Sequence, residues 1–171
     1  MPPLVKRTLV TALRVWLGVA WLVPGLAKVR DAAWTGADAG AAVAAFAQDA
    51  VAKAAGANPA VHAWYAEFLE GVVIPNAALF GHLVAWAEVL VGAALVLGAF
   101  TGFAALIAAL MNVNYLLAGA IGVNPLLLAV ALLILVGIEQ AEPFGVDGVL
   151  RPRVEEAAGK GVKTLKERTA L

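Results

Sequence analysis

Residues 14–28 read RVWLGVAWLVPGLAK, an almost wholly apolar stretch that begins with an arginine and ends with a lysine. On a helix, five of these residues fall on one face: Arg14, Gly18, Trp21, Gly25 and Lys28. Glycines at this spacing allow the backbone of a neighbouring helix to approach closely. The sequence therefore predicts a helix whose glycine face turns toward other helices and carries two cations with it.

The composition of the whole chain is that of an integral membrane protein. Hydrophobic residues make up 63% and charged residues 14% of its 171 residues, against about 45–50% and 25% in soluble domains. Four segments approach the roughly 20 apolar residues that cross a bilayer, at about residues 8–27, 77–97, 102–120 and 124–138. Short turns join the last three, so we predict an all-α fold, an antiparallel four-helix bundle in the membrane.

Charge placement predicts the orientation of this bundle. Residues 1–150 should form the membrane domain and residues 151–171 a basic tail, and eight of the twelve basic residues flank the two ends of the domain. By the positive-inside rule, both termini are expected in the cytoplasm. The acidic connection, residues 28–76, is expected outside. Its apolar periodicity predicts amphipathic helices that lie along the outer membrane surface or cap the bundle.

A buried polar layer is the first candidate site. Glu88 is the single acid of residues 77–97, and a lone carboxylate within a membrane faces the protein interior and pairs. Helical depth places Arg14 and Asn112 near it, so these three residues are the candidate catalytic group. Two interpretations remain open: a cluster that only sets helix register, or a small site that holds an anion or a quinone carbonyl.

A second candidate set lies closer to the outer surface. Lys28, His82, Trp21 and Tyr115 are the expected substrate-binding residues. Lys28 could equally be an interfacial anchor whose ammonium group reaches the headgroups, and a structural role is favoured for His82. Asn114 points away from Asn112 on the same helix and is expected to serve packing.

Several functions are disfavoured by composition. The 12 basic residues are balanced by 12 acidic ones, so no overall basic field points to nucleic acid. The chain has no cysteine, which excludes disulfides and iron–sulfur ligation by its own thiolates. Two histidines with scattered acids do not predict a metal site, and no flavin or haem motif is present.

The order of these residues resembles the DoxX/DoxD-like family of bacterial membrane proteins. The resemblance rests on Arg14, Gly18, Gly25 and Lys28, on Glu88-Val-Leu-Val-Gly92 leading to Leu97-Gly98, and on Phe144-Gly-Val-Asp147-Gly148. It implies a multi-pass protein of the bacterial cytoplasmic membrane that works in a redox system. One such member is the DoxD-type subunit of thiosulfate:quinone oxidoreductase, which oxidises thiosulfate to tetrathionate and reduces quinone. Arg14, Lys28 and Glu88 match the charged positions of the family pattern.

Two functions of different classes follow from the resemblance. The first is a redox subunit that passes electrons from thiosulfate or a related sulfur compound to membrane quinone, with a second redox subunit or a soluble redox protein as partner. The second is a non-catalytic scaffold that anchors soluble redox partners. Homo-oligomerisation is left open. A transporter is disfavoured, because four helices without an evident inverted repeat offer little for alternating access.

Overall fold

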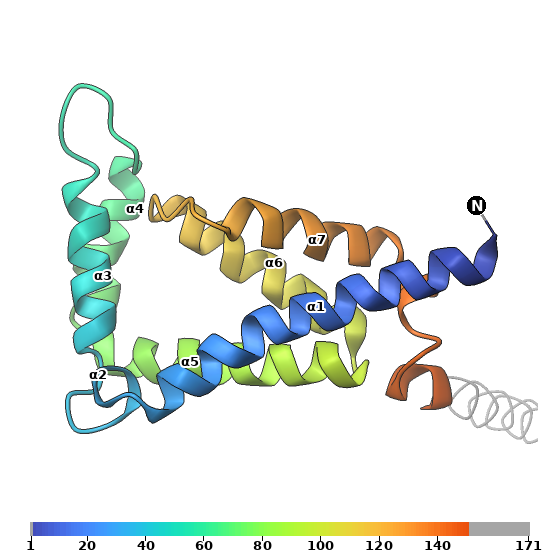
Figure 1. The fold of residues 1–171 in the computed structure, drawn as a ribbon. Coiled ribbons are helices and arrows are strands. Elements are labelled where there is room, and N and C mark those ends of the chain that lie inside the picture. Colours follow the sequence, from blue (N-terminus) through green and yellow to red (C-terminus); the bar gives the residue numbers. More distant parts are fainter. Residues whose placement is uncertain (1, 151–171) are drawn as a thin grey trace, which may run out of the picture.

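Residues 2–150 are described here from a computed structural model, and their regular structure is entirely helical (Figure 1). Two helices, α1 (Pro3–Arg30) and α5 (Ala77–Leu97), are long and apolar enough to cross a membrane. The helices α6 (Thr101–Leu117) and α7 (Asn124–Val136) are apolar but shorter. The short α8 (Ile138–Ala141) follows α7. The fold is thus that expected of an all-α membrane protein.

The predicted helix bounds agree with the structure in the middle of the chain and differ at the ends. The helix predicted at residues 77–97 has those bounds. The first helix is longer than residues 8–27, because Pro3 occupies its first turn and the chain does not leave the helix until Asp31. The third helix ends at Leu117 rather than residue 120, close to Gly119, whose φ of 71° lies in the left-handed region.

Helices α1 and α5 pack antiparallel along their glycine faces. A Cβ atom added at Gly25 would lie 2.8 Å from Glu88 Cβ, and one added at Gly92 would lie 2.4 Å from the backbone nitrogen of Leu22. Only glycine permits this approach, as the spacing in the sequence predicted. Helices α6 and α7 pack beside this pair, and their side chains complete one apolar core.

Large apolar side chains also cover the outside of the long helices. On α5, Leu83 is 55% and Leu90 is 66% exposed, and similar residues recur on α1, α6 and α7. Such a surface is unfavourable in water and suits contact with lipid chains.

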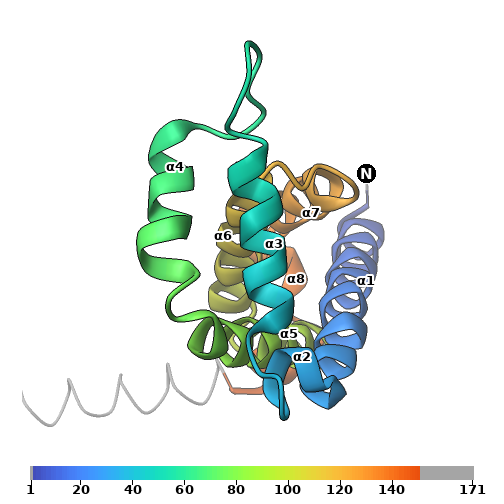
Figure 2. The same ribbon diagram turned by 90° about the vertical axis from the view of Figure 1, so that its left-hand side faces the viewer.

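A helical cap covers one end of the molecule. The cap, residues 31–76, contains α2 (Ala32–Thr35), α3 (Ala41–Ala52), α4 (Ala63–Phe68) and the π-helix η1 (Leu69–Val73). In Figure 1, α3 and α4 run across the ends of α5 and α6, and Figure 2 shows them upright in front of the long helices. The cap has a small core of its own, which includes Val43, Ala47, Tyr65 and Leu69. The predicted amphipathic helices are therefore present.

Candidate functional site

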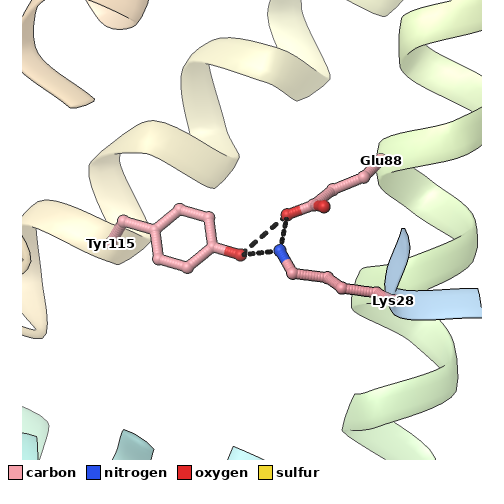
Figure 3. Close-up of polar contacts among 3 residues, drawn as sticks. All are labelled: Lys28, Glu88 and Tyr115. Carbon is pink, nitrogen blue, oxygen red and sulfur yellow. Dashed lines mark hydrogen bonds and ion pairs between the residues drawn. The ribbon is translucent and has the colours of Figure 1, made fainter. Parts of the chain in front are cut away.

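Three polar side chains from three helices meet beneath the cap (Figure 3). Lys28 comes from the last turn of α1, Glu88 from the middle of α5 and Tyr115 from the last turn of α6. The Lys28 ammonium group forms an ion pair with Glu88 Oε1 and donates to the Tyr115 hydroxyl at 3.3 Å. The Tyr115 hydroxyl donates to the same carboxylate oxygen at 2.9 Å. We call these three residues the polar cluster.

Aromatic rings enclose the polar cluster. The Lys28 ammonium lies 4.7 Å from the centre of the Trp34 ring, which belongs to the cap, and this contact adds a cation–π attraction. The Tyr115 ring stacks on Trp21 with ring centroids 6.3 Å apart. It also makes an edge-to-face contact with Phe46, with ring centroids 5.8 Å apart. Bundle and cap together therefore hold the hydroxyl of Tyr115 in place.

Charge within the cluster is balanced and largely shielded. The Glu88 side chain is 2% exposed and that of Lys28 is 19% exposed. A carboxylate in such surroundings requires a compensating charge, which Lys28 supplies. Glu88 Oε2 is buried and has no hydrogen-bond partner among the described residues. The cluster thus contains an acceptor that is free to take a further hydrogen bond.

Arg14 does not belong to this cluster, which corrects the predicted Arg14–Glu88 pair. Its side chain is fully enclosed, and its guanidinium donates to the carbonyl oxygens of Ala141 and Phe144, both at 2.8 Å. Gly98, at the end of α5, packs directly on the guanidinium. Arg14 therefore anchors the segment that follows α8 rather than the carboxylate of Glu88.

The error lies in the relative position of the two long helices. The prediction placed the start of the first helix level with the end of α5. In the structure Gly98, just after α5, lies level with Arg14. Glu88 comes ten residues before Gly98, so it lies about 15 Å away along the helix at 1.5 Å per residue. The first turns of α1 extend beyond α5 (Figure 1). Helical periodicity identified the right face, but it carries no information on this offset.

The segment after α8 explains the Phe144–Gly148 motif of the sequence. The Asp147 carboxylate accepts the backbone N–H groups of Phe100 and Thr101, each at 2.8 Å. It thereby caps the start of α6. The Asp147 backbone N–H donates to the Gly98 carbonyl at 2.8 Å. This motif thus has a structural role at the end of the molecule opposite the cap.

The remaining predicted site residues divide between the interior and the surface. Asn112 is completely buried, but its amide nitrogen donates to the Ala108 carbonyl of its own helix at 2.9 Å, and no bond joins it to Glu88 or Arg14. His82 is exposed, and its Nδ1 is paired with the Ala78 carbonyl, one turn back on α5. The structure therefore brings Lys28, Trp21 and Tyr115 together with Glu88 and leaves His82 outside.

An apolar cavity of about 320 Å³ lies between the cap and helices α5 and α6. Six of its lining residues are aromatic: Trp34, Phe46, Tyr65, Phe68, Phe80 and Tyr115. Two of the lining residues, Phe68 and Leu110, are 39% and 55% exposed, so they mark the mouth of the cavity. Because Tyr115 lines the cavity and bonds to Glu88 and Lys28, the polar cluster lies at the cavity wall.

Sequence reasoning did not identify most of the cavity. Trp34 and Phe46 belong to the connection that was predicted to form amphipathic helices on the membrane surface or over the bundle, and their contacts with Lys28 and Tyr115 depend on how the cap folds back. Tyr65 of the cap donates to Asn114 Oδ1 at 2.8 Å, across 49 residues of sequence. Asn114 was expected to serve packing, yet it lines the cavity. The one available signal was an amide next to Tyr115 on a largely apolar helix.

The arrangement suits the binding of an apolar ring and the exchange of protons, and offers little to a metal. No three Asp, Glu or His side chains within residues 2–150 gather closely enough to hold a metal ion. The cavity size falls in the range of small-molecule sites, which are mostly apolar with a few polar groups.

Comparison with known protein families agrees with the membrane fold. The DoxX family model matches residues 9–119, from the first turns of α1 through the end of α6. The chain belongs to the DoxX family and is a membrane protein of that family. No curated protein and no solved structure matches it.

Proposed function

We propose that this chain is the quinone-binding membrane subunit of a redox system that oxidises thiosulfate or a related sulfur compound, as in the DoxD-type enzymes. The observation that carries the proposal is the aromatic cavity, whose wall includes Tyr115 bonded to Glu88 and Lys28. A quinone ring is flat and apolar with carbonyl oxygens at its edge. Aromatic walls accommodate the ring, and the polar cluster lies where a carbonyl must receive protons.

The chemistry of quinone reduction explains why a polar cluster should border the cavity. Reduction of a quinone to a quinol takes up two electrons and two protons. The Tyr115 hydroxyl and the Lys28 ammonium hold transferable protons, and Glu88 accepts hydrogen bonds from both. A proton donor positioned at the reacting oxygen accelerates such steps by about 10²–10⁴-fold. We assign proton delivery to Tyr115. Lys28, which donates to the Tyr115 hydroxyl, replaces each proton and is recharged from solvent, while the Glu88 carboxylate holds both groups in place.

Oxidation of the sulfur compound is assigned to a partner protein. Two thiosulfate ions yield one tetrathionate ion and two electrons, which balances the two electrons of quinone reduction. The charge of Lys28 is already compensated by Glu88, so Lys28 offers little attraction to a dianion. His82, another residue expected to bind substrate, is exposed and bonded within its own helix. The chain then supplies the quinone site, and its partner supplies the electrons.

The proposed placement in the membrane follows from the charges and the fold. Helices α1, α5, α6 and α7 cross the bacterial cytoplasmic membrane as an antiparallel bundle, with the cap outside and both termini in the cytoplasm. The cavity mouth at Phe68 and Leu110 is then next to lipid, close to the outer surface. Quinone would enter from the bilayer rather than from water.

The test is quinone reduction by the chain together with the redox partner that co-purifies with it. In lipid nanodiscs, the pair should reduce decylubiquinone when thiosulfate is added. Tyr115→Phe keeps the ring that packs on Trp21 and Phe46 but removes the hydroxyl, and should lower turnover at least about tenfold. Trp64→Phe, on the exposed face of α4, serves as the matched control and should leave turnover unchanged. A folded pair that reduces no quinone would favour the scaffold function.

A further inference from the structure

Asn114 is a polar residue of the cavity wall that does not belong to the polar cluster. It comes directly before Tyr115 on α6 and lies at the exposed mouth of the cavity. A carboxamide on the outside of a membrane helix is unfavourable unless its polar atoms are satisfied. The structure satisfies only one end of it.

Tyr65 holds the oxygen of this carboxamide. Its hydroxyl donates to Asn114 Oδ1 at 2.8 Å and is also 3.2 Å from the Asn114 backbone oxygen. Tyr65 is 3% exposed and packs in the core of the cap. Burial raises the pKa of the Tyr65 phenol above its usual value, so this hydroxyl stays protonated and remains a donor.

The orientation of Asn114 leaves its amino group available. With Oδ1 held by Tyr65, the two N–H groups of Asn114 Nδ2 have no partner among the described residues. Most of the surrounding wall is apolar, including Phe46, Leu69 and Leu110. A donor in such surroundings gains most from a ligand that presents an acceptor.

We propose that Asn114 Nδ2 donates a hydrogen bond to a carbonyl oxygen of the quinone ring, and that Tyr65 is the positioning residue that fixes the amide in the donating orientation. This inference rests on the proposed function and adds a recognition residue to it. The ligand class it defines is a flat apolar ring with an acceptor oxygen at the edge. The ester carbonyl of a phospholipid shares part of this chemistry, so the experiment must distinguish the two sources.

Quinone binding can be measured without turnover or a partner protein. The full-length chain in nanodiscs is titrated with decylubiquinone, and bound quinone is detected by quenching of tryptophan fluorescence, since Trp34 lines the cavity. Asn114→Leu should raise the dissociation constant about tenfold, the effect of one lost hydrogen bond. Asn114→Asp retains an oxygen for Tyr65 but has no donor and should weaken binding similarly. Asn76→Leu replaces an exposed asparagine outside the cavity lining and is the matched control.

A double-mutant cycle tests the role of Tyr65. Tyr65→Phe should weaken quinone binding about threefold in the native background and have no further effect when Asn114 is already leucine, because positioning matters only when the amide is present. A merely structural role of Tyr65 would weaken binding equally in both backgrounds. An alkylbenzene with the same tail tests the acceptor, since its affinity should be unchanged in Asn114→Leu.

Each further outcome decides for or against the inference. If the native chain binds quinone and both Asn114 variants bind it equally well, the inference is wrong and the proposed function stands. If the native chain binds no quinone in any lipid, both are wrong. If quinone binds in nanodiscs of ether lipids but not of ester lipids, the Asn114 amide serves a lipid ester and the assignment to quinone is overturned. Equal affinity in both lipids supports it.

Discussion

At the scale of single residues, the pairing of Lys28 with Glu88 is the feature most open to direct test. Lys28→Met leaves the buried carboxylate of Glu88 without its counter-charge and should lower the free energy of unfolding by about 3 kcal/mol. The double variant Lys28→Met, Glu88→Gln removes both charges and should recover most of this loss. The measurement is unfolding by SDS titration in mixed micelles. Strictly additive losses would show that the two side chains are not coupled.

A second ion pair provides the control for this experiment. Lys53 Nζ lies 2.6 Å from Asp49 Oδ2. Asp49 is on α3 and Lys53 comes directly after it, and both side chains are exposed. Asp49→Asn should therefore change the free energy of unfolding by less than about 1 kcal/mol. The contrast between the two pairs tests whether burial, rather than charge alone, makes the Lys28–Glu88 pair important.

At the scale of helices, the contact between α1 and α5 depends on glycine. A Cβ atom at Gly92 would lie 2.4 Å from Leu22 N and 2.6 Å from Leu22 Cα, and backbone cannot yield as a flexible side chain can. Gly92→Ala should therefore destabilise the protein by about 1–3 kcal/mol. Gly102→Ala on α6 is the matched control, because its nearest neighbour would be an ordinary 3.6 Å contact with Ile138. Unfolding of Gly92→Ala at the native SDS concentration would contradict the observed packing of the two helices.

At the scale of the whole molecule, the proposed orientation in the membrane can be tested by labelling. The chain has no cysteine, so single cysteines at Lys6, Asp49 and Lys163 report without interference. In intact cells only the variant at Asp49, on the cap, should react with a membrane-impermeant maleimide, and the other two should react after the membrane is opened. Labelling of Lys163→Cys from outside would reverse the proposed orientation or change the number of crossings.

The sequence by itself determined which segments are helical and which faces turn inward. Hydropathy located residues 77–97 to the residue, and glycine spacing identified the face of α1 that contacts α5. It also marked Glu88 as a carboxylate that needs a partner, since an unpaired charge among apolar residues is costly, and it placed Lys28 and Tyr115 among the candidate substrate-binding residues. These properties follow from local periodicity and from the free energy of burying single groups, and both can be read along the chain.

Only the tertiary structure decided which of these residues meet. Glu88 pairs with Lys28 and not with Arg14, because the offset between α1 and α5 is determined by backbone contacts at Gly18, Gly25 and Gly92. The cavity likewise depends on how residues 31–76 fold back over α5 and α6, which brings Tyr65 to Asn114 across 49 residues. Helical periodicity repeats every turn and fits several offsets equally well. The close packing of backbones and side chains selects one of them.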